Sequence, residues 1–489
     1  MKNKVQLIAY VDRITGGGVQ DLQHLLEGSF SQLFGGIHLL PFFHPIDGSD
    51  AGFDPIDHTQ VDTRLGTWDD LRMLASSIDV MADVIVNHAS SMSPQFLDYS
   101  LQGRDSPYAG LFLTFDRVFP GGASEADLLR IYRPRPGLPF KYSTLANGEK
   151  RLFWTTFTHQ QIDIDVTHPQ GNAYLNAILE RFSQVGIRAI RLDAVGYAIK
   201  KSGTNCFMLP ETFRFIEELT TRAHRLGMEV LVEVHCYYKQ QVDIALHVDW
   251  VYDFALPPLV LHALINADAK PLVRWLGIRP NNAITVLDTH DGIGVIDVGA
   301  DAIGNPGLLE PSEIIDLVDT IHRRSNGQST KATGEAANNL DLYQVNCTYL
   351  DALGNDPVLY LIARAIQFFV PGIPQIYYVG LFGGTNDMEL LARSGVGRDI
   401  NRHHFTMEEV ESSLKRPMVQ RLLELICLRN SHPAFNGECI VESTSRDVLS
   451  IAWELEGDWI TLNVDLSRPC AIIEHSIDQI RRGATFRIE

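Results

Sequence analysis

One stretch of the sequence, GIRAIRLDAVGY at residues 186–197, begins as a buried strand and ends in two charges. Its apolar first half is typical of a parallel strand that is covered on both faces. Arg191 and Asp193 follow, and opposite charges at the end of a core strand are costly unless they are paired or used in chemistry. Because side chains alternate along a strand, these two residues should share one face. The stretch therefore predicts a core strand whose carboxyl end carries a polar site.

Seven other stretches have the same β-rich character and are bounded by turn residues. Amphipathic stretches lie between several of them, for example residues 67–77, for which Thr67 is the expected N-cap. Strand and helix alternate eight times, which predicts an α/β fold, a (β/α)8 TIM barrel. The eight predicted strands cover residues 5–11, 36–43, 79–88, 186–193, 228–235, 250–256, 283–291 and 372–380.

Two gaps between predicted strands are far longer than one barrel unit requires, which indicates insertions after the third and seventh strands. Both insertions leave from carboxyl ends of strands, where barrel enzymes build their active sites, so we expect them to form walls of a pocket. The last segment alternates apolar and polar residues and predicts a small β domain. The expected parts are the barrel (1–88, 167–291 and 356–435), the two inserts (89–166 and 292–355) and the C-terminal β domain (436–489).

Composition and charge exclude several classes of function. The 489 residues carry a net charge of −19, which would repel nucleic acid, so we expect no nucleic-acid partner. No apolar run approaches the roughly 20 residues of a membrane span, and the N-terminal stretch MKNKVQLIAYVD lacks a signal-peptide cleavage site. The six cysteines form no CxxC pair, which is typical of reduced thiols. We therefore expect a cytoplasmic protein with no disulfides and no membrane contact.

Three acidic residues stand at the ends of three different predicted strands: Asp193, Glu233 and Asp291. Any one of them, taken alone, is as well explained by a salt bridge that closes the top of the barrel. Packed together, the three carboxylates would repel one another, which a protein selected only for stability would avoid. The ensemble therefore favours a catalytic site.

Clustered carboxylates suit the cleavage of glycosidic bonds. A retaining enzyme uses one carboxylate as nucleophile and a second carboxyl group, about 5 to 5.5 Å away, as proton donor. Arg191 should favour the ionised form of Asp193, which suits a nucleophile. The apolar neighbours of Glu233 should raise its pKa, which suits an acid.

Four segments resemble, in chain order, the strand-end motifs of the α-amylase superfamily: ADVIVNH (82–88), IRLDAVGY (190–197), EVLVEVH (229–235) and VLDTHD (286–291). Further segments, among them HLLPFFHPIDGSDAGFDPIDH (38–58) and NLDLYQVN (339–346), resemble the sucrose phosphorylases of glycoside hydrolase family 13 over essentially the whole chain. By this resemblance Asp193 is the nucleophile, Glu233 the acid/base and Asp291 the stabiliser of the transition state. The resemblance also implies that neither a metal nor a cofactor is used, and it suggests a homodimer.

The same resemblance implies a subsite for the glucosyl unit of the substrate. Asp50 and Arg398 would grip the outer hydroxyls, and His88 and His290 would donate or accept further hydrogen bonds. Phe53 and Phe157 would supply apolar walls, although ordinary core packing explains Phe157 equally well. The expected substrate-binding set on this side consists of Asp50, Phe53, His88, Phe157, Gln161, Arg191, His290 and Arg398.

A second subsite would receive fructose and phosphate in turn. A phosphorylase must bind a dianion beside its own carboxylates, so it requires local positive charge and directed donors. The candidates are Arg135, Tyr197, His235, Asp341, Tyr343 and Gln344, with Asp341 and Gln344 implied to favour the neutral sugar. Arg135 can also be read as a surface arginine in a Pro-rich loop. The expected ligands are sucrose, inorganic phosphate, glucose 1-phosphate and fructose.

Three alternative functions are also compatible with the sequence. The chain could be a phosphorylase for a related α-glucoside, such as sucrose 6'-phosphate or glucosylglycerol. It could be an α-glucoside hydrolase or transglucosidase, which would share all three acids. A barrel retained only as a binding module is the alternative from another class, and the presence of all three acids argues against it.

Overall fold

The computed structural model describes residues 1–48, 50–134, 137–301, 303–334, 344–477 and 480–489. All eight predicted strands form, and they close into a parallel barrel in the order β1-β16-β13-β12-β11-β10-β5-β2. The (β/α)8 fold class is confirmed. The barrel strands are β1 (Gln6–Ala9), β2 (Gly36–Leu39), β5 (Asp79–Ile85), β10 (Ala189–Asp193), β11 (Glu229–Val232), β12 (Trp250–Asp253), β13 (Ala283–Thr285) and β16 (Ile373–Tyr377).

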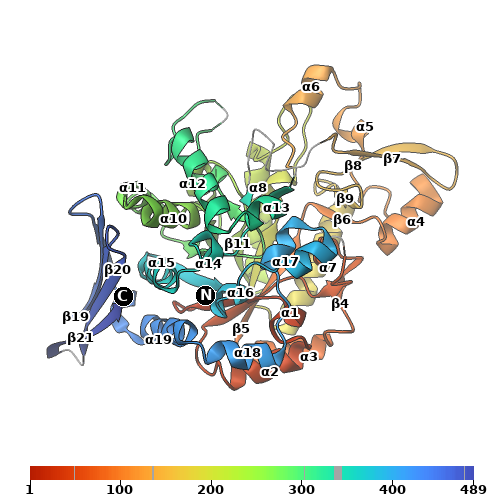
Figure 1. Cartoon of the computed structure of the whole chain (residues 1–489). Coiled ribbons are helices and arrows are strands. Elements are labelled where there is room, and N and C mark those ends of the chain that lie inside the picture. The colour runs from red at the N-terminus through yellow and green to blue at the C-terminus, as the bar shows by residue number, and fades with distance from the viewer. Residues whose placement is uncertain (49, 135–136, 302, 335–343, 478–479) are drawn as a thin grey trace.

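Helices cover the outside of this barrel (Figure 1). Thr67 is the N-cap of helix α3 as expected, because its hydroxyl accepts a hydrogen bond from the backbone N–H of Asp70. Gly186 ends the helix before β10 with a φ of 93°, a left-handed conformation that suits glycine, and so turns the chain into the strand that carries Asp193. The main covering helices are α2 (Val19–Glu27), α3 (Trp68–Ser77), α7 (Pro169–Val185), α8 (Pro210–Arg225), α10 (Leu256–Asn266), α15 (Pro357–Phe369) and α19 (Pro417–Ser431).

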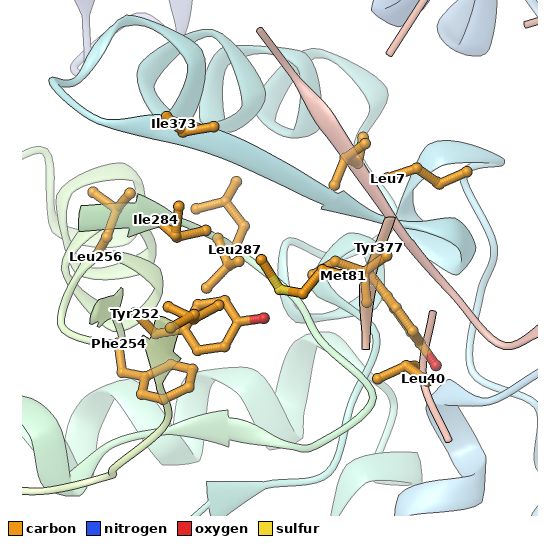
Figure 2. Close-up of a cluster of buried hydrophobic side chains, with 14 of the residues drawn as sticks. Leu7, Leu40, Met81, Tyr252, Phe254, Leu256, Ile284, Leu287, Ile373 and Tyr377 are labelled. Carbon is orange, nitrogen blue, oxygen red and sulfur yellow. The ribbon is translucent and has the colours of Figure 1, made fainter. Parts of the chain in front are cut away.

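Apolar side chains from non-adjacent parts of the chain meet in the core of the barrel. Figure 2 shows Leu7 of β1, Met81 of β5, Tyr252 of β12 and Ile284 of β13 gathered in one cluster. Each of these four side chains is at most 4% exposed. The predicted strands are nearly continuous in apolar residues because they are buried on both faces.

The segment 89–166 folds beside the barrel, at the right of Figure 1, around a small apolar cluster of its own. It contains α4 (Pro94–Gln102), α5 (Phe115–Val118), α6 (Glu125–Arg130) and the hairpin of β7 (Phe140–Thr144) and β8 (Lys150–Trp154). Its base is tied to the barrel tip, since β6 (His88–Ser90) pairs in antiparallel register with β9 (Gln161–Asp163).

The segment 292–355 also leaves from a strand end, that of β13. Its described elements include β14 (Ile293–Gly294), α12 (Pro311–Arg324), α13 (Gln328–Thr333), β15 (Gln344–Val345) and α14 (Tyr349–Ala352). The short strands β14 and β15 pair in antiparallel register, which brings Gln344 back beside Gly294.

The C-terminal segment forms a five-stranded antiparallel sheet, on the side of the barrel away from the first insert (Figure 1). Its strands are β17 (Glu438–Glu442), β18 (Val448–Leu455), β19 (Asp458–Asp465), β20 (Cys470–Ile477) and β21 (Ile480–Ile488). The alternating pattern thus predicted this sheet correctly. The limits of the individual domains stay predictions.

Two expectations about the whole chain concern membranes and thiols. In the part of the chain that the structure describes, no helix has the length and apolar character needed to cross a bilayer. All six cysteines are free.

Candidate active site

The three acids that the sequence singled out line one pocket at the mouth of the barrel. Asp193 is the last residue of β10, Glu233 directly follows β11, and Asp291 lies beyond β13. The eleven expected site residues that line this pocket are Asp50, Phe53, His88, Phe157, Asp193, Tyr197, Glu233, His235, His290, Asp291 and Arg398.

Arg191 lies beneath this pocket and connects the acids. Its guanidinium pairs with Asp83, and it lies 3.2 Å from Oδ1 of Asp193 and 3.6 Å from Oε2 of Glu233. The expectation that Arg191 and Asp193 share a face is confirmed. Burial raises the pKa of Asp83, but Arg191 and His38 outweigh it and leave that pKa at about 2. Asp83 therefore acts as the permanent counter-charge that fixes Arg191.

The expected electrostatic effect of Arg191 on Asp193 is present, but other groups oppose it. Burial raises the pKa of Asp193 well above its ordinary value, and although Arg191 lowers it, Glu233 and Asp83 raise it further. One guanidinium is shared among three carboxyl groups, so its charge does not outweigh the desolvation of Asp193. Arg191 thus favours the ionised form of Asp193 as expected, while burial and the neighbouring acids oppose it.

Asp291 lies in a far more positive environment. Its Oδ1 is 2.8 Å from Nη1 of Arg398 and 3.7 Å from Nη2 of Arg402, whose side chain is 1% exposed. Burial raises the pKa of Asp291, but Arg398, His290 and Arg402 together hold it far below the ordinary value. Asp291 therefore stays ionised, which suits a group that stabilises developing positive charge.

Glu233 and Asp291 lie close together, and Asp193 lines the same pocket. Single side-chain atoms of Glu233, His235 and Asp291 lie within 4.8 Å of one another. The backbone N–H of Ala194, whose φ of 55° is left-handed, points at Oε2 of Glu233 over 3.5 Å and so ties Glu233 to the tip that carries Asp193. Glu233, His235 and Asp291 could also offer atoms to a metal ion, but arginines already pair with both carboxyl groups.

Aromatic rings and neutral imidazoles form one wall of the pocket. The ring of Phe53 stacks on that of His290 with centroids 4.7 Å apart. His88 donates from Nε2 to the backbone carbonyl of Phe53 over 2.9 Å, and its ring meets Phe157 edge-on. Burial lowers the pKa of His290 to about 3 and also lowers that of His88, so both rings are neutral at ordinary pH. Phe157 belongs to this wall, so the structure favours the pocket over plain core packing for this residue.

Gln161 lies behind this wall. Its Nε2 is 3.2 Å from Oδ2 of Asp50 and 3.1 Å from Nε2 of His88. The side chain is fully buried. Gln161 thus donates to Asp50 and packs against His88, and it does not itself line the pocket.

Another part of the pocket lining contains His235 and a group of aromatic rings. Tyr197 packs against Phe157 and Phe207, and Tyr132 stacks near both Tyr197 and Phe207. Gln344 reaches the wall from β15, with its Nε2 3.1 Å from Nε2 of His235. The expected residues Arg135, Asp341 and Tyr343 lie outside the described residues.

Several pocket residues were not identified from the sequence. Arg402 follows Arg398 by four positions in GRDINRH, and only its burial beside Asp291 shows that it belongs here. The remaining residues are apolar or small, and neither charge nor a motif distinguishes them in the sequence. The pocket residues missed in this way are Pro134, Ala194, Gly196, Phe207 and Val234.

Known proteins resemble the chain along its length. The profile of the α-amylase catalytic domain matches residues 33–242. A sucrose phosphorylase of Agrobacterium vitis is 60% identical over 97% of this chain and 98% of that protein. A sucrose phosphorylase of Bifidobacterium adolescentis is 50% identical over 97% and 96%. The crystal structure of a sucrose 6F-phosphate phosphorylase from Thermoanaerobacter thermosaccharolyticum superposes with a TM-score of 0.92 at 38% identity, covering 99% and 98%.

Proposed function

The chain belongs to the family of the sucrose phosphorylases, and on that premise we propose that it converts sucrose and phosphate reversibly into α-D-glucose 1-phosphate and D-fructose. It is an enzyme of the glycosyltransferase class. The observation that carries the proposal is the convergence of three carboxyl groups, from three strand ends, on one pocket that also contains a histidine beside the acid. The similarity to sucrose phosphorylases supports sucrose as the substrate. The geometry of the pocket supports the proposed roles of the three acids.

In the first step, an oxygen of Asp193 attacks the anomeric carbon of the glucosyl unit. The bond from that carbon to the bridging oxygen breaks, and Glu233 donates a proton to this oxygen, so that fructose leaves as a neutral molecule. Positive charge develops on the sugar ring during the step. The ionised Asp291, held by Arg398 over 2.8 Å, stabilises that charge.

In the second step, a phosphate oxygen attacks the glucosyl enzyme from the side that fructose has left. Glu233, now ionised, accepts the proton that the phosphate oxygen carries, and the bond to Asp193 breaks. Two successive displacements retain the α configuration. Arg191 balances the negative charge that returns to Asp193, since it lies 3.2 Å from that carboxyl group.

We also propose that the enzyme is cytoplasmic and forms a homodimer. Six free cysteines agree with a reducing compartment. Light scattering coupled to gel filtration tests the homodimer, and a mass equal to one chain would exclude it.

A phosphorolysis assay tests the proposed function. Purified enzyme is incubated with phosphate and with sucrose, sucrose 6'-phosphate or glucosylglycerol in separate reactions, and glucose 1-phosphate and free glucose are measured. We expect glucose 1-phosphate with sucrose as the preferred substrate. A hydrolase would yield free glucose at every phosphate concentration, and preference for another glucoside would replace sucrose in the proposal.

A further inference from the structure

Asp297 is a buried acid that contacts His235 at the rim of the pocket. Its Oδ2 lies 2.8 Å from Nδ1 of His235, and its side chain is 0% exposed. A carboxylate only accepts hydrogen bonds, so Nδ1 of His235 carries a hydrogen and donates it to Asp297. The other ring nitrogen, Nε2, lies 3.1 Å from Nε2 of Gln344 and 3.9 Å from Oε1 of Glu233, and the ring lines the pocket.

Several contacts hold Asp297 and His235 in place. Asp297 accepts hydrogen bonds from the backbone N–H of Cys236 over 3.1 Å and from Nε2 of Gln241 over 2.8 Å. The ring of His235 stacks on Phe254 with centroids 3.8 Å apart. A Cβ on Gly294 would come within 2.5 Å of Asp297 and 3.0 Å of His235, so the backbone of β14 closes over both side chains. These contacts hold the ring of His235 in one orientation.

The groups around His235 favour its positive form. Burial lowers the pKa of His235, but Asp297, Glu233 and Asp291 outweigh it and raise that pKa above the ordinary value. Phe254 and the uncharged amide of Gln344 complete the surroundings. When Nε2 of His235 carries a hydrogen, the Gln344 amide must turn its oxygen to it, because two N–H donors cannot face each other. His235 is thus a fixed donor, readily charged, beside the acid that works in both steps.

We propose that Asp297 is a positioning residue that acts through His235 and directs the glucosyl enzyme towards phosphate rather than water. This inference rests on the proposed function, because it concerns the second step of that reaction. A phosphate dianion must approach beside Glu233 and Asp193, and a fixed N–H donor with positive charge offsets their repulsion. Neutral water gains far less from such a group.

The partition of the glucosyl enzyme between the two acceptors tests this role. Glucose 1-phosphate and free glucose arise from the same intermediate, so their ratio at fixed phosphate is independent of the folded fraction and of the first step. Asp297→Asn keeps the shape and removes the charge, and we expect the ratio to fall by roughly tenfold or more, as the loss of a charge-assisted hydrogen bond implies. The matched control Asp316→Asn, on the exposed face of α12, should leave the ratio unchanged.

A double-mutant cycle separates positioning from a merely structural role. His235→Gln alone should lower the ratio, and adding Asp297→Asn to it should lower the ratio no further. Gly294→Ala, which presses on both side chains, should lower the ratio as well. An unchanged ratio in Asp297→Asn, or an equal further fall in the His235→Gln background, would overturn the inference while leaving the proposed function intact. If the unaltered enzyme forms no glucose 1-phosphate, the proposed function fails and this inference fails with it.

Discussion

Arg191 is the residue on which the electrostatics of the site depend. It contacts Asp83, Asp193 and Glu233 from a position that is 3% exposed in its side chain. In the proposed mechanism two of these acids serve the chemistry, and the third holds the arginine in place. A single buried cation would then balance a reaction in which negative charge moves between Asp193 and Glu233.

The pH dependence of the first step should follow the pKa of Asp193. Attack requires the ionised form, and burial raises this pKa, so the acid limb of kcat/KM for sucrose should lie above the ordinary pKa of an aspartate. Arg191→Gln removes the cation that lowers this pKa, and the acid limb should move to still higher pH. The measurement is kcat/KM against pH. Arg188→Gln, at an exposed position just before the same strand, should leave the limb in place.

The loss of rate on replacing Glu233 should increase with the basicity of the leaving group. Glu233→Gln removes the proton donor, and general acid catalysis contributes about a hundredfold or more, so phosphorolysis of sucrose should fall by at least that factor. α-Glucosyl fluoride has a leaving group that needs no protonation, and its first step should be nearly unaffected. The measurement is the rate of Glu233→Gln relative to the unaltered enzyme with sucrose and with α-glucosyl fluoride. An equal loss of rate with both donors would count against Glu233 as the acid.

Among the elements, the pair of β6 and β9 ties the first insert to the barrel and carries His88 and Gln161 into the site. A buried lysine holds this junction. The ammonium group of Lys200, whose side chain is 1% exposed, pairs with Asp163 of β9 and donates to Oδ1 of Asn87 over 2.6 Å. Lys200 lies in the segment after β10, Asp163 in β9 and Asn87 just after β5, so three parts of the chain meet at the ammonium group of Lys200.

Lys200→Met should loosen the base of the insert. It leaves the carboxyl group of Asp163 buried and uncompensated, and breaking a buried pair in this way costs about 3 to 5 kcal/mol. We expect a lower thermal midpoint, faster proteolysis within residues 89–166 and a raised KM for sucrose. Lys201→Met is the matched control, because Lys201 pairs with Glu211 at the surface with 58% of its side chain exposed. Equal effects of the two substitutions would show that the buried contact is unimportant.

How far the sequence predicts these elements depends on the range of the interaction. The eight strands follow from nearly continuous apolar stretches bounded by turn residues, and the shared face of Arg191 and Asp193 follows from the period of two along a strand. The junction at Lys200 does not, because its partner Asn87 is 113 positions away. The net direction of the pKa shift of Asp193 could not be predicted from the sequence for a related reason. The neighbour Arg191 is visible in the sequence, whereas the burial that outweighs it exists only in the folded pocket.

In the whole molecule, the candidate active site lies at one end of the barrel, and the C-terminal sheet supports the fold from the side. Trp453 of β18 donates from its indole N–H to the backbone carbonyl of Phe369 over 2.7 Å, at the end of α15. The ring also packs near Phe435, with centroids 5.7 Å apart. No described residue of this sheet lines the pocket.

Trp453→Ala should therefore separate stability from activity. The loss of a large buried side chain costs about 3 to 5 kcal/mol, so the thermal midpoint should fall clearly. The kcat of the folded enzyme at moderate temperature should stay the same. Trp459→Ala, at a half-buried position in the same sheet, should lower the midpoint less. A large change in kcat for Trp453→Ala would assign this sheet a part in the chemistry.

The central claim is that Asp193 becomes glucosylated while Glu233 and Asp291 act on the same anomeric carbon. Trapping the intermediate tests it most directly. In Glu233→Gln, α-glucosyl fluoride should glucosylate the enzyme, and without phosphate or a general base the adduct should persist. Peptide mapping by mass spectrometry should then find one glucosyl unit on the peptide that contains Asp193 and none in the Asp193→Ala variant. A glucosyl unit on another residue, or product formation with no adduct at all, would contradict the account.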